Sequence, residues 1–344
     1  MTAATYNGSR TFSTSEPAPT PPGPGEVQIA VSYTGLCGTD LHIFHGDMDA
    51  RVSMPAIIGH EMSGVIAELG EDVTGWTVGQ PVTVMPTLSC GSCAACTRGH
   101  GHICHKLDFI GIDSDGSMQS AWNVPEEVVV ALPEDLALDE AALIEPTAVA
   151  VHDVRRARLV AGEFVVVIGG GPVGQLIASV ALICGARVVL VELDPARRTL
   201  AKESGINAID PREQNLLDLV MQETGGAGAD VAFEVSGAAA GVNSAVDVLT
   251  TRGRLVMVAI HPQPKEIDLH RFFWRELEMF GARLYQREDF EEAVRLVASG
   301  SIPARRLISR IVTLHDVEQG FLALESGGAM KVLVDCRPEA GAAS

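Results

Sequence analysis

The chain has 344 residues, 47% of them hydrophobic and 20% charged, which is the composition of a globular protein. It is too long for one hydrophobic core, so two domains are expected. Its 44 acidic and 25 basic side chains give a net charge of −19, which repels nucleic-acid phosphate and excludes a nucleic-acid partner. The first ten residues are polar and predict no secretory signal, so we expect a cytoplasmic protein with reduced thiols.

The first part of the chain predicts a mainly β domain, with short apolar runs at residues 27–33, 64–69 and 80–85 that are interrupted by glycine and proline. Cys37, His60 and Glu61 lie in this region and Glu145 follows it. A thiol, an imidazole and carboxylates form a mixed ligand set that suits an exchangeable zinc position. The alternatives are a small buried side chain for Cys37, a core histidine for His60, and glutamates that only orient the ligands.

Four cysteines have C-x2-C-x2-C-x7-C spacing within a lobe at about residues 88–106: Cys90, Cys93, Cys96 and Cys104. Four thiolates this close can complete a tetrahedral shell around zinc and leave no position for substrate, as in a structural site. An iron–sulfur run of the ferredoxin type has three residues before its fourth cysteine and a proline after it, whereas here seven residues precede Cys104 and a histidine follows. The spacing therefore favours structural zinc. Cys184 and Cys336 lie outside both sets and are expected to be buried.

Residues 164–186 carry no charged side chain and are long enough to span a membrane. Glycines at 169–171 divide this stretch, so we predict a strand, a tight turn and a helix, and no membrane association. The turn has the G-x-G-x-x-G pattern of dinucleotide-binding sites, whose glycines permit the sharp turn, the approach of pyrophosphate and close helix packing. The candidate cofactor-binding residues of the turn are Gly169, Gly171, Pro172, Val173 and Gly174.

Glu192 lies in a second apolar run, residues 187–193, at the distance from the turn that is expected of a ribose-binding carboxylate. Its charge repels a 2′-phosphate, so NAD(H) is predicted rather than NADP(H), although the nearby Arg197 and Arg198 could serve a phosphate. The alternative for Glu192 is a solvated strand end.

Runs at residues 230–235 and 254–258 predict further buried parallel strands. Residues 147–285 are therefore predicted to form a doubly wound Rossmann domain of the α/β class. A helix at 290–298 and a strand at 331–336 follow, and we expect them to rejoin the β domain. The catalytic domain then comprises residues 1–146 and 286–344.

In their order along the chain, several segments resemble the zinc-dependent medium-chain dehydrogenases, in the branch of the sorbitol, butanediol and threonine dehydrogenases. The segments are residues 35–42 (GLCGTDLH), the triplet at 59–61 (GHE), the cysteine lobe, residues 144–146 (IEP) and the glycine turn. The resemblance implies a GroES-like catalytic domain together with the Rossmann domain. It also implies homo-oligomers, with residues 277–282 as a candidate seam.

The resemblance assigns a role to each candidate residue of the catalytic domain. It implies that Cys37, His60 and Glu61 ligate the catalytic zinc, and that Glu145 stands where the branch has a carboxylate in the zinc sphere. Either glutamate is then free to exchange with water.

Two further positions match a proton path in the family. Thr39 and His42 occupy the places of a hydroxyl and an imidazole that lead toward solvent, and histidine titrates near neutrality. The alternatives are a turn residue and a surface histidine. Asp40 is expected to orient its neighbours rather than to react.

The resemblance implies a zinc-dependent NAD(H) dehydrogenase that reversibly oxidises a secondary alcohol, vicinal diol or polyol to the ketone, by hydride transfer from a zinc-bound alkoxide. Leu284 lies where sorbitol dehydrogenases have an arginine for sugar hydroxyls, so a small secondary alcohol or diol is the first choice of substrate. The alternatives are an activity like that of L-threonine 3-dehydrogenase and a non-catalytic zinc- and NAD-binding protein. Core packing is expected for Trp122 and Trp274.

Overall fold

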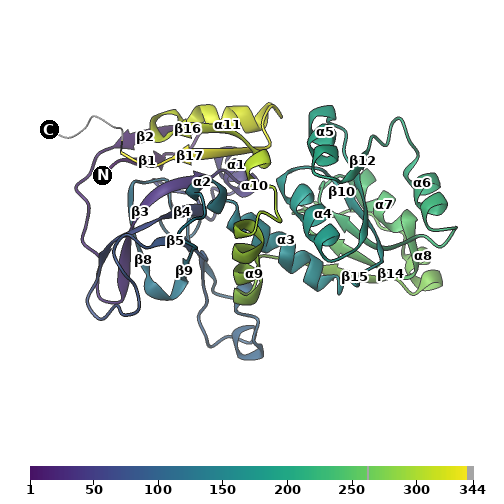
Figure 1. The fold of residues 1–344 in the computed structure, drawn as a ribbon, viewed down its shortest axis with the longest axis horizontal. Helices are drawn as coiled ribbons and strands as arrows, with labels where there is room; N and C mark the ends of the chain where they lie inside the picture. Colours follow the sequence, from purple (N-terminus) through teal and green to yellow (C-terminus); the bar gives the residue numbers. More distant parts are fainter. Residues whose placement is uncertain (262, 339–344) are drawn as a thin grey trace. The chain divides into compact units, whose positions relative to one another are not determined.

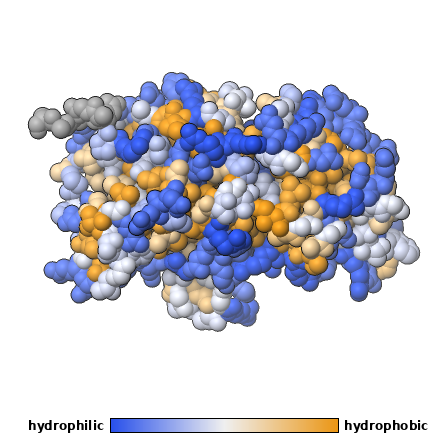
Figure 2. Space-filling model, viewed as in Figure 1, coloured by the Kyte–Doolittle hydropathy of each residue, from blue (hydrophilic) through white to orange (hydrophobic). Residues whose placement is uncertain are grey.

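The structure is a computed structural model that describes residues 1–261 and 263–338. It divides into two compact units (Figure 1). Unit 1 comprises Met1–Glu145, Gln286–Gly300 and the described residues from Ala304 onward, and unit 2 comprises Pro146–Tyr285 with Ser301–Pro303. Hydrophilic residues cover much of the face shown in Figure 2, with apolar patches between them. Within the described ranges, no helix has both the length and the apolar character needed to cross a membrane.

Unit 1 is built on a seven-stranded sheet in the order β16-β17-β3-β4-β5-β9, in which β8 also pairs with β3. Val27, Ile29 and Val31 alternate along β3 and are almost completely buried, so one face of the sheet forms the core. The strands of this sheet are β3 (Glu26–Gly35), β4 (Glu61–Leu69), β5 (Pro81–Val84), β8 (Ala121–Pro125), β9 (Val129–Ala131), β16 (Ile308–Thr313) and β17 (Lys331–Asp335). Two small hairpins pair β1 (Ala3–Tyr6) with β2 (Phe12–Ser15) and β6 (Thr87–Leu88) with β7 (Asp108–Phe109).

The last strand of the described chain, β17, pairs antiparallel with β3, near the start of the chain. The strand expected near the C-terminus is therefore present and completes the sheet of unit 1. Helix α11 packs against β16 and β17 (Figure 1). The helices of this unit are α1 (Gly38–Phe44), α2 (Leu138–Ala141), α9 (Arg287–Ala298), α10 (Ala304–Leu307) and α11 (Val317–Glu325), and α3 (Ile144–Arg156) begins in unit 1 and continues into unit 2.

Unit 2 is a six-stranded parallel sheet in the order β12-β11-β10-β13-β14-β15. All five residues of β10 are buried, as expected of a strand that is covered on both faces. The strands are β10 (Phe164–Ile168), β11 (Arg187–Val191), β12 (Asn207–Ile209), β13 (Ala229–Glu234), β14 (Leu249–Met257) and β15 (Glu278–Gly281). The helices are α4 (Pro172–Ile183), α5 (Pro195–Glu203), α6 (Leu216–Glu223), α7 (Ala239–Val248) and α8 (Leu269–Arg275).

This strand order is that of the Rossmann fold, with the sequential direction reversing between β10 and β13. The predicted α/β class is confirmed. Ligands of such sheets bind outside the carboxyl ends of the strands at this switch point.

Four burial predictions can be compared with the structure. Trp122 is 3% exposed and packs in the core as expected, and Cys336 is also buried. Trp274 is 68% exposed, because α8 buries none of its residues, so its predicted core packing is wrong. Cys184 is exposed, because it caps the C-terminus of α4 beyond the apolar segment, so that prediction is wrong as well.

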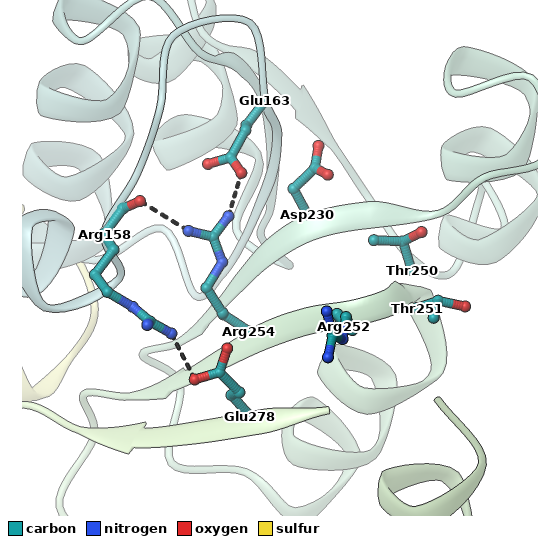
Figure 3. Close-up of a pocket in the computed structure, with 8 residues that line it drawn as sticks. All are labelled: Arg158, Glu163, Asp230, Thr250, Thr251, Arg252, Arg254 and Glu278. Carbon is teal, nitrogen blue, oxygen red and sulfur yellow. Dashed lines mark hydrogen bonds and ion pairs between the residues drawn. The ribbon is translucent and has the colours of Figure 1, made fainter. Parts of the chain in front are cut away.

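The amino ends of the strands of unit 2 carry a charged pocket of about 350 Å³ (Figure 3). Arg158 pairs with Glu278 at 2.5 Å, and Arg254 pairs with Glu163. Asp230 accepts a hydrogen bond from the backbone of β10. Opposite charges are thus paired within the pocket. We interpret these pairs as structural, because the cofactor is expected at the carboxyl ends of the strands.

Candidate functional site

The first candidate site lies in unit 1, where β3 and β4 pair. One ligand atom from each of Cys37, His60 and Glu61 lies within 4.8 Å of the others. Cys37 follows β3 and Glu61 opens β4, and the antiparallel register places Gly35 opposite Glu61. A Cβ atom on Gly35 would overlap the Glu61 carboxylate, so the cluster requires glycine there.

Asp40 holds two residues of the cluster in place. It is fully buried on α1, its Oδ2 accepts a hydrogen bond from the Cys37 N–H at 2.9 Å, and its Oδ1 lies 3.5 Å from His60 Nδ1. Asp40 Oδ1 and His60 Nδ1 form no hydrogen bond that meets the usual geometry with any described residue. Burial disfavours the His60 cation, but Asp40 and Cys37 together outweigh burial, so the pKa of His60 is raised well above its usual value.

Lys331 was not anticipated as a functional residue. It opens β17, is 2% exposed, and donates to both carboxylate oxygens of Glu61 at 2.8 and 2.5 Å and to the carbonyl of Leu36 at 3.1 Å. Burial lowers the pKa of Lys331. The negative charges of Glu61 and Cys37 raise it by more than burial lowers it, so the pKa lies above its usual value. The available signal was a lysine at the start of an otherwise apolar strand, a position where a charge needs a partner.

Glu145, Thr39 and His42 lie outside the group of three ligand residues. Glu145 is buried in the first turn of α3, outside the group of ligand atoms that lie within 4.8 Å of one another. Thr39 is half-buried on α1, and its N–H donates to Cys37 Sγ at 3.5 Å. His42, one turn further on, is exposed, and its Nδ1 lies 2.9 Å from Asp47 Oδ2.

The thiol, imidazole and carboxylate of the cluster fit an exchangeable zinc ion. They are the donor types that zinc prefers, and Asp40 lies beside His60 Nδ1, as a carboxylate that orients a metal-ligating histidine does.

The second candidate site is the cysteine lobe. The four thiols lie within 4.8 Å of one another, with Sγ–Sγ distances of 3.5 Å for Cys93 and Cys96, 3.8 Å for Cys93 and Cys104, and 3.4 Å for Cys90 and Cys104. A tetrahedron with zinc–sulfur bonds of about 2.3 Å has edges of about 3.8 Å, so the spacing fits zinc. Donation from the Ser92 backbone and hydroxyl lowers the pKa of Cys90 to about 6, which favours the thiolate that zinc needs.

The third candidate site is the glycine turn between β10 and α4 in unit 2. Gly169 has φ +107°, where a side chain is strained, and a Cβ on Gly174 would overlap the carbonyl oxygen of Gly169. Helix α4 begins after Gly171 with no side-chain cap and with Pro172 in its first turn. Its N-terminal N–H groups are therefore available to a phosphate.

Glu192 directly follows β11, and its carboxylate is held by the backbone. Its Oε2 accepts from the Gly170 N–H at 2.7 Å and its Oε1 accepts from the Asp194 N–H at 2.8 Å. Arg198 forms an ion pair with Asp210 at 2.9 Å, and Arg197 Nη1 lies 4.0 Å from Glu192 Oε2. Both guanidinium groups therefore already face carboxylates.

Comparison with known proteins identifies the family of the chain. Residues 23–134 match the alcohol dehydrogenase GroES-like domain, and residues 172–299 match the zinc-binding dehydrogenase family. The 2-dehydro-3-deoxy-L-galactonate 5-dehydrogenase of Pseudoalteromonas atlantica is 47% identical over 98% of this chain and 100% of its own length. The sorbitol dehydrogenase of Halalkalibacterium halodurans is 36% identical over 96% of this chain and 97% of its own length.

Solved structures show the same fold. The 2R,3R-butanediol dehydrogenase of Bacillus subtilis is 30% identical, with a TM-score of 0.89 over 98% of this chain and 99% of its own. A zinc-binding dehydrogenase structure from Sinorhizobium meliloti, bound to NADP, is 29% identical, with a TM-score of 0.92 over 97% of this chain and 98% of its own.

The fold and the sites define an oxidoreductase with a GroES-like catalytic part and a Rossmann nucleotide-binding part. The chain belongs to the zinc-dependent medium-chain alcohol dehydrogenase family, as the sequence predicts, and it is an NAD-linked alcohol dehydrogenase that uses zinc.

Proposed function

We propose that this enzyme oxidises a secondary hydroxyl of a polyhydroxy carboxylic acid to the ketone, with NAD⁺ as the hydride acceptor. The observation that carries the proposal is the 47% identity, over the whole of its length, to a dehydrogenase of a 2-dehydro-3-deoxy sugar acid. Leu284 disfavours sorbitol itself, because a side chain without a donor stands where sorbitol dehydrogenases have an arginine for sugar hydroxyls. L-threonine, another hydroxy acid, is the second candidate, since threonine dehydrogenases of 35–36% identity cover 91% of this chain.

We assign the metal ligands on the geometry of the two clusters. Cys37 and His60 hold the catalytic zinc, and the carboxylates of Glu61 and Glu145 serve as exchangeable ligands. Glu61 belongs to the cluster in the present structure and Glu145 lies outside it. The structural zinc is held by the four thiols of the lobe.

The proton leaves through residues of α1. Bound zinc supplies a Lewis acid for the alcohol oxygen, and NAD⁺ supplies the acceptor for the hydride. The Thr39 hydroxyl takes the substrate proton, and His42 passes it to solvent. The Asp47 carboxylate beside His42 Nδ1 orients the imidazole ring. Because the His42 side chain is exposed, the ring can release the proton to solvent.

The cofactor is NAD(H) rather than NADP(H). The Glu192 carboxylate accepts two backbone hydrogen bonds and keeps lone pairs for the ribose hydroxyls, and it repels a 2′-phosphate. Arg197 and Arg198 are the groups that could reverse this preference. Arg198 is already paired with Asp210, which supports NAD(H).

We also infer a cytoplasmic homo-oligomer. Strand β15 is the edge of the parallel sheet, and Met279 on it is 55% exposed. An uncovered apolar edge strand favours pairing with a second copy. Among the described residues none of the seven cysteines forms a disulfide, which is the state that a reducing compartment maintains.

The test is NAD⁺ reduction, followed at 340 nm, on 2-dehydro-3-deoxy sugar acids, sorbitol, 2,3-butanediol and L-threonine, with zinc measured on the same preparation. We expect two zinc ions per chain and the highest kcat/KM on a sugar acid. Turnover confined to sorbitol or butanediol would refute the substrate class. Cys37→Ser should abolish turnover with the fold retained, and Cys184→Ser, an exposed thiol outside both clusters, is the matched control.

A further inference from the structure

A buried acid–imidazole pair lies in unit 2, outside all of the sites described above. Glu234 is the last residue of β13 and is fully buried. Its Oε2 lies 3.1 Å from Nε2 of His261, whose side chain is 15% exposed. The two residues are brought together because the segment that follows β14 returns over the end of β13, where the N–H groups of Val258 and Ala259 both donate to the Glu234 carbonyl.

The loop after β13 stabilises the charge on Glu234. The Glu234 Oε1 accepts hydrogen bonds from Ser236 N at 3.0 Å, Ser236 Oγ at 2.5 Å and Gly237 N at 3.0 Å. Three donors on one oxygen are the arrangement that favours an ionised carboxylate. The other oxygen faces only His261, and neither ring nitrogen of His261 makes a hydrogen bond to a described residue. The two oxygens of Glu234 therefore have different surroundings, with three donors at Oε1 and the His261 ring at Oε2.

The pair lies at the switch point of the sheet. Glu234 ends β13, which is the neighbour of β10 on the side where the strand order reverses. The loop also touches the glycine turn, since a Cβ on Gly169 would lie 2.9 Å from Ser236 N. Glu192, at the end of β11, marks the adenosine side of the cofactor, so the nicotinamide side corresponds to the carboxyl ends of β13 and β14.

We propose that the buried Glu234 carboxylate, which His261 faces, sets the relative affinity of the enzyme for oxidised and reduced cofactor. This inference rests on the proposed binding of NAD(H) at the carboxyl edge of this sheet. The nicotinamide ring of NAD⁺ is a cation and that of NADH is neutral, so a buried negative charge near this end of the sheet favours NAD⁺. A more tightly held NAD⁺ and a more readily released NADH suit an enzyme that works in the direction of alcohol oxidation.

The effect should be measurable in cofactor binding alone. A unit charge about 10 Å from a cationic ring, at an effective dielectric constant of about 20, changes relative affinity roughly tenfold. Glu234→Gln removes the charge and keeps the shape, so the ratio of the NAD⁺ dissociation constant to that of NADH should rise about tenfold. His261→Lys places a permanent cation beside the carboxylate and should raise the ratio in the same direction, whereas His261→Gln should not change it.

Asp230→Asn is the matched control. Asp230 lies on the same strand as Glu234, at its amino end, in the pocket of Figure 3. Glu234 lies four positions after Asp230, or about 13 Å along the strand. The Asp230 charge lies at the end away from the switch point. Removing it should leave the ratio unchanged.

The experiment titrates the purified protein with NADH by fluorescence and with NAD⁺ by competition, at one alkaline pH, after circular dichroism shows that each variant is folded. A raised ratio in Glu234→Gln and His261→Lys, with Asp230→Asn unchanged, supports the proposal. An unchanged ratio, or an equal loss of affinity for both cofactors, overturns it. If Glu234→Gln does not fold, His261→Lys decides the question by the same criterion. Failure of the unmodified protein to bind NADH refutes the proposed function itself, and the inference with it.

Discussion

Replacing Lys331 by Met tests whether a buried ion pair controls the catalytic cluster. The lysine side chain is 3% exposed and that of Glu61 is 1% exposed. Two hydrogen bonds to Glu61 and one to the Leu36 carbonyl would be lost. Methionine matches the length of the apolar part of lysine, so the change removes the charge with little loss of packing.

The expected cost follows from the burial of the carboxylate that is left behind. Breaking a buried ion pair by removing one partner costs about 3–5 kcal/mol, because the remaining charge has no compensation. The free energy of unfolding of zinc-free Lys331→Met should therefore fall by about that amount. Adding Glu61→Gln to this variant should restore much of the loss, since no buried charge then remains.

Zinc should change this result in a specific way. With Lys331 absent, a zinc ion held by Cys37 and His60 becomes the cation nearest to Glu61. Zinc should therefore stabilise Lys331→Met by more than it stabilises the unmodified enzyme. The kcat/KM of the variant should fall, because a carboxylate that binds the metal firmly competes with substrate for the same position.

The assay is urea unfolding, followed by tryptophan fluorescence, with and without zinc, on the single and double variants. The reasoning is refuted if zinc-free Lys331→Met is within about 1 kcal/mol of the unmodified enzyme, or if zinc stabilises both proteins equally.

The same ion pair predicts a pH dependence. Burial lowers the pKa of Lys331, but the negative charges of Glu61 and Cys37 raise it by a larger amount. The folded state therefore binds the ammonium proton of Lys331 more tightly than the unfolded state does. The contribution of the ammonium is complete below the unfolded pKa of about 10.5 and is lost as the pH rises through the higher folded value. The stability difference between the unmodified enzyme and Lys331→Met should therefore be constant from about pH 6 to about pH 9 and shrink only above about pH 10.5.

Three further changes test the remaining sites. Gly174→Ala should cost roughly 1–3 kcal/mol and weaken NADH binding, because the new methyl overlaps the Gly169 carbonyl, whereas Gly281→Ala meets open space and should be neutral by thermal denaturation and NADH titration. Glu192→Ala should weaken NAD⁺ and narrow its advantage over NADP⁺, and equal kcat/KM ratios before and after the change would contradict the ribose role. Cys96→Ser should lower the zinc content from two ions to one per chain, measured by metal analysis, and lower the melting temperature; unchanged zinc content would remove Cys96 from the structural site.

Local spacing explains why much of the fold and of the candidate site could be predicted. The four cysteines of the lobe lie within fifteen residues of one another, and the glycine turn joins a strand directly to a helix. In both cases the residues that act together are neighbours in the chain, so the pattern of residue types carries the geometry. The strand at 164–168 was predicted at its observed bounds for the same reason, since a β-branched run ended by glycine has few alternatives.

Pairs of residues far apart in the sequence could not be predicted in this way. Lys331 lies 270 residues from Glu61, and its role depends on the antiparallel pairing of β17 with β3. Glu234 ends β13, and His261 lies in the segment after β14, which returns over the end of β13 and brings the two side chains together. A sequence shows that such residues are charged or titratable, whereas their partners follow from the strand order.

The buried charges around the catalytic cluster explain why one position remains open to substrate. Asp40 fixes Cys37 and His60 from one side, while Lys331 holds both oxygens of Glu61 from the other. Glu61 must give up its contact with Lys331 before it can ligate a metal ion firmly. The lost ion pair offsets the gained metal bond, so water or substrate can replace Glu61 as a ligand. The hydrogen bonds of Lys331 go to Glu61 and the Leu36 carbonyl and not to the thiol or the imidazole. These contacts support the proposal of two firm ligands and one exchangeable ligand, which is the division of roles that suits an alcohol-binding zinc site.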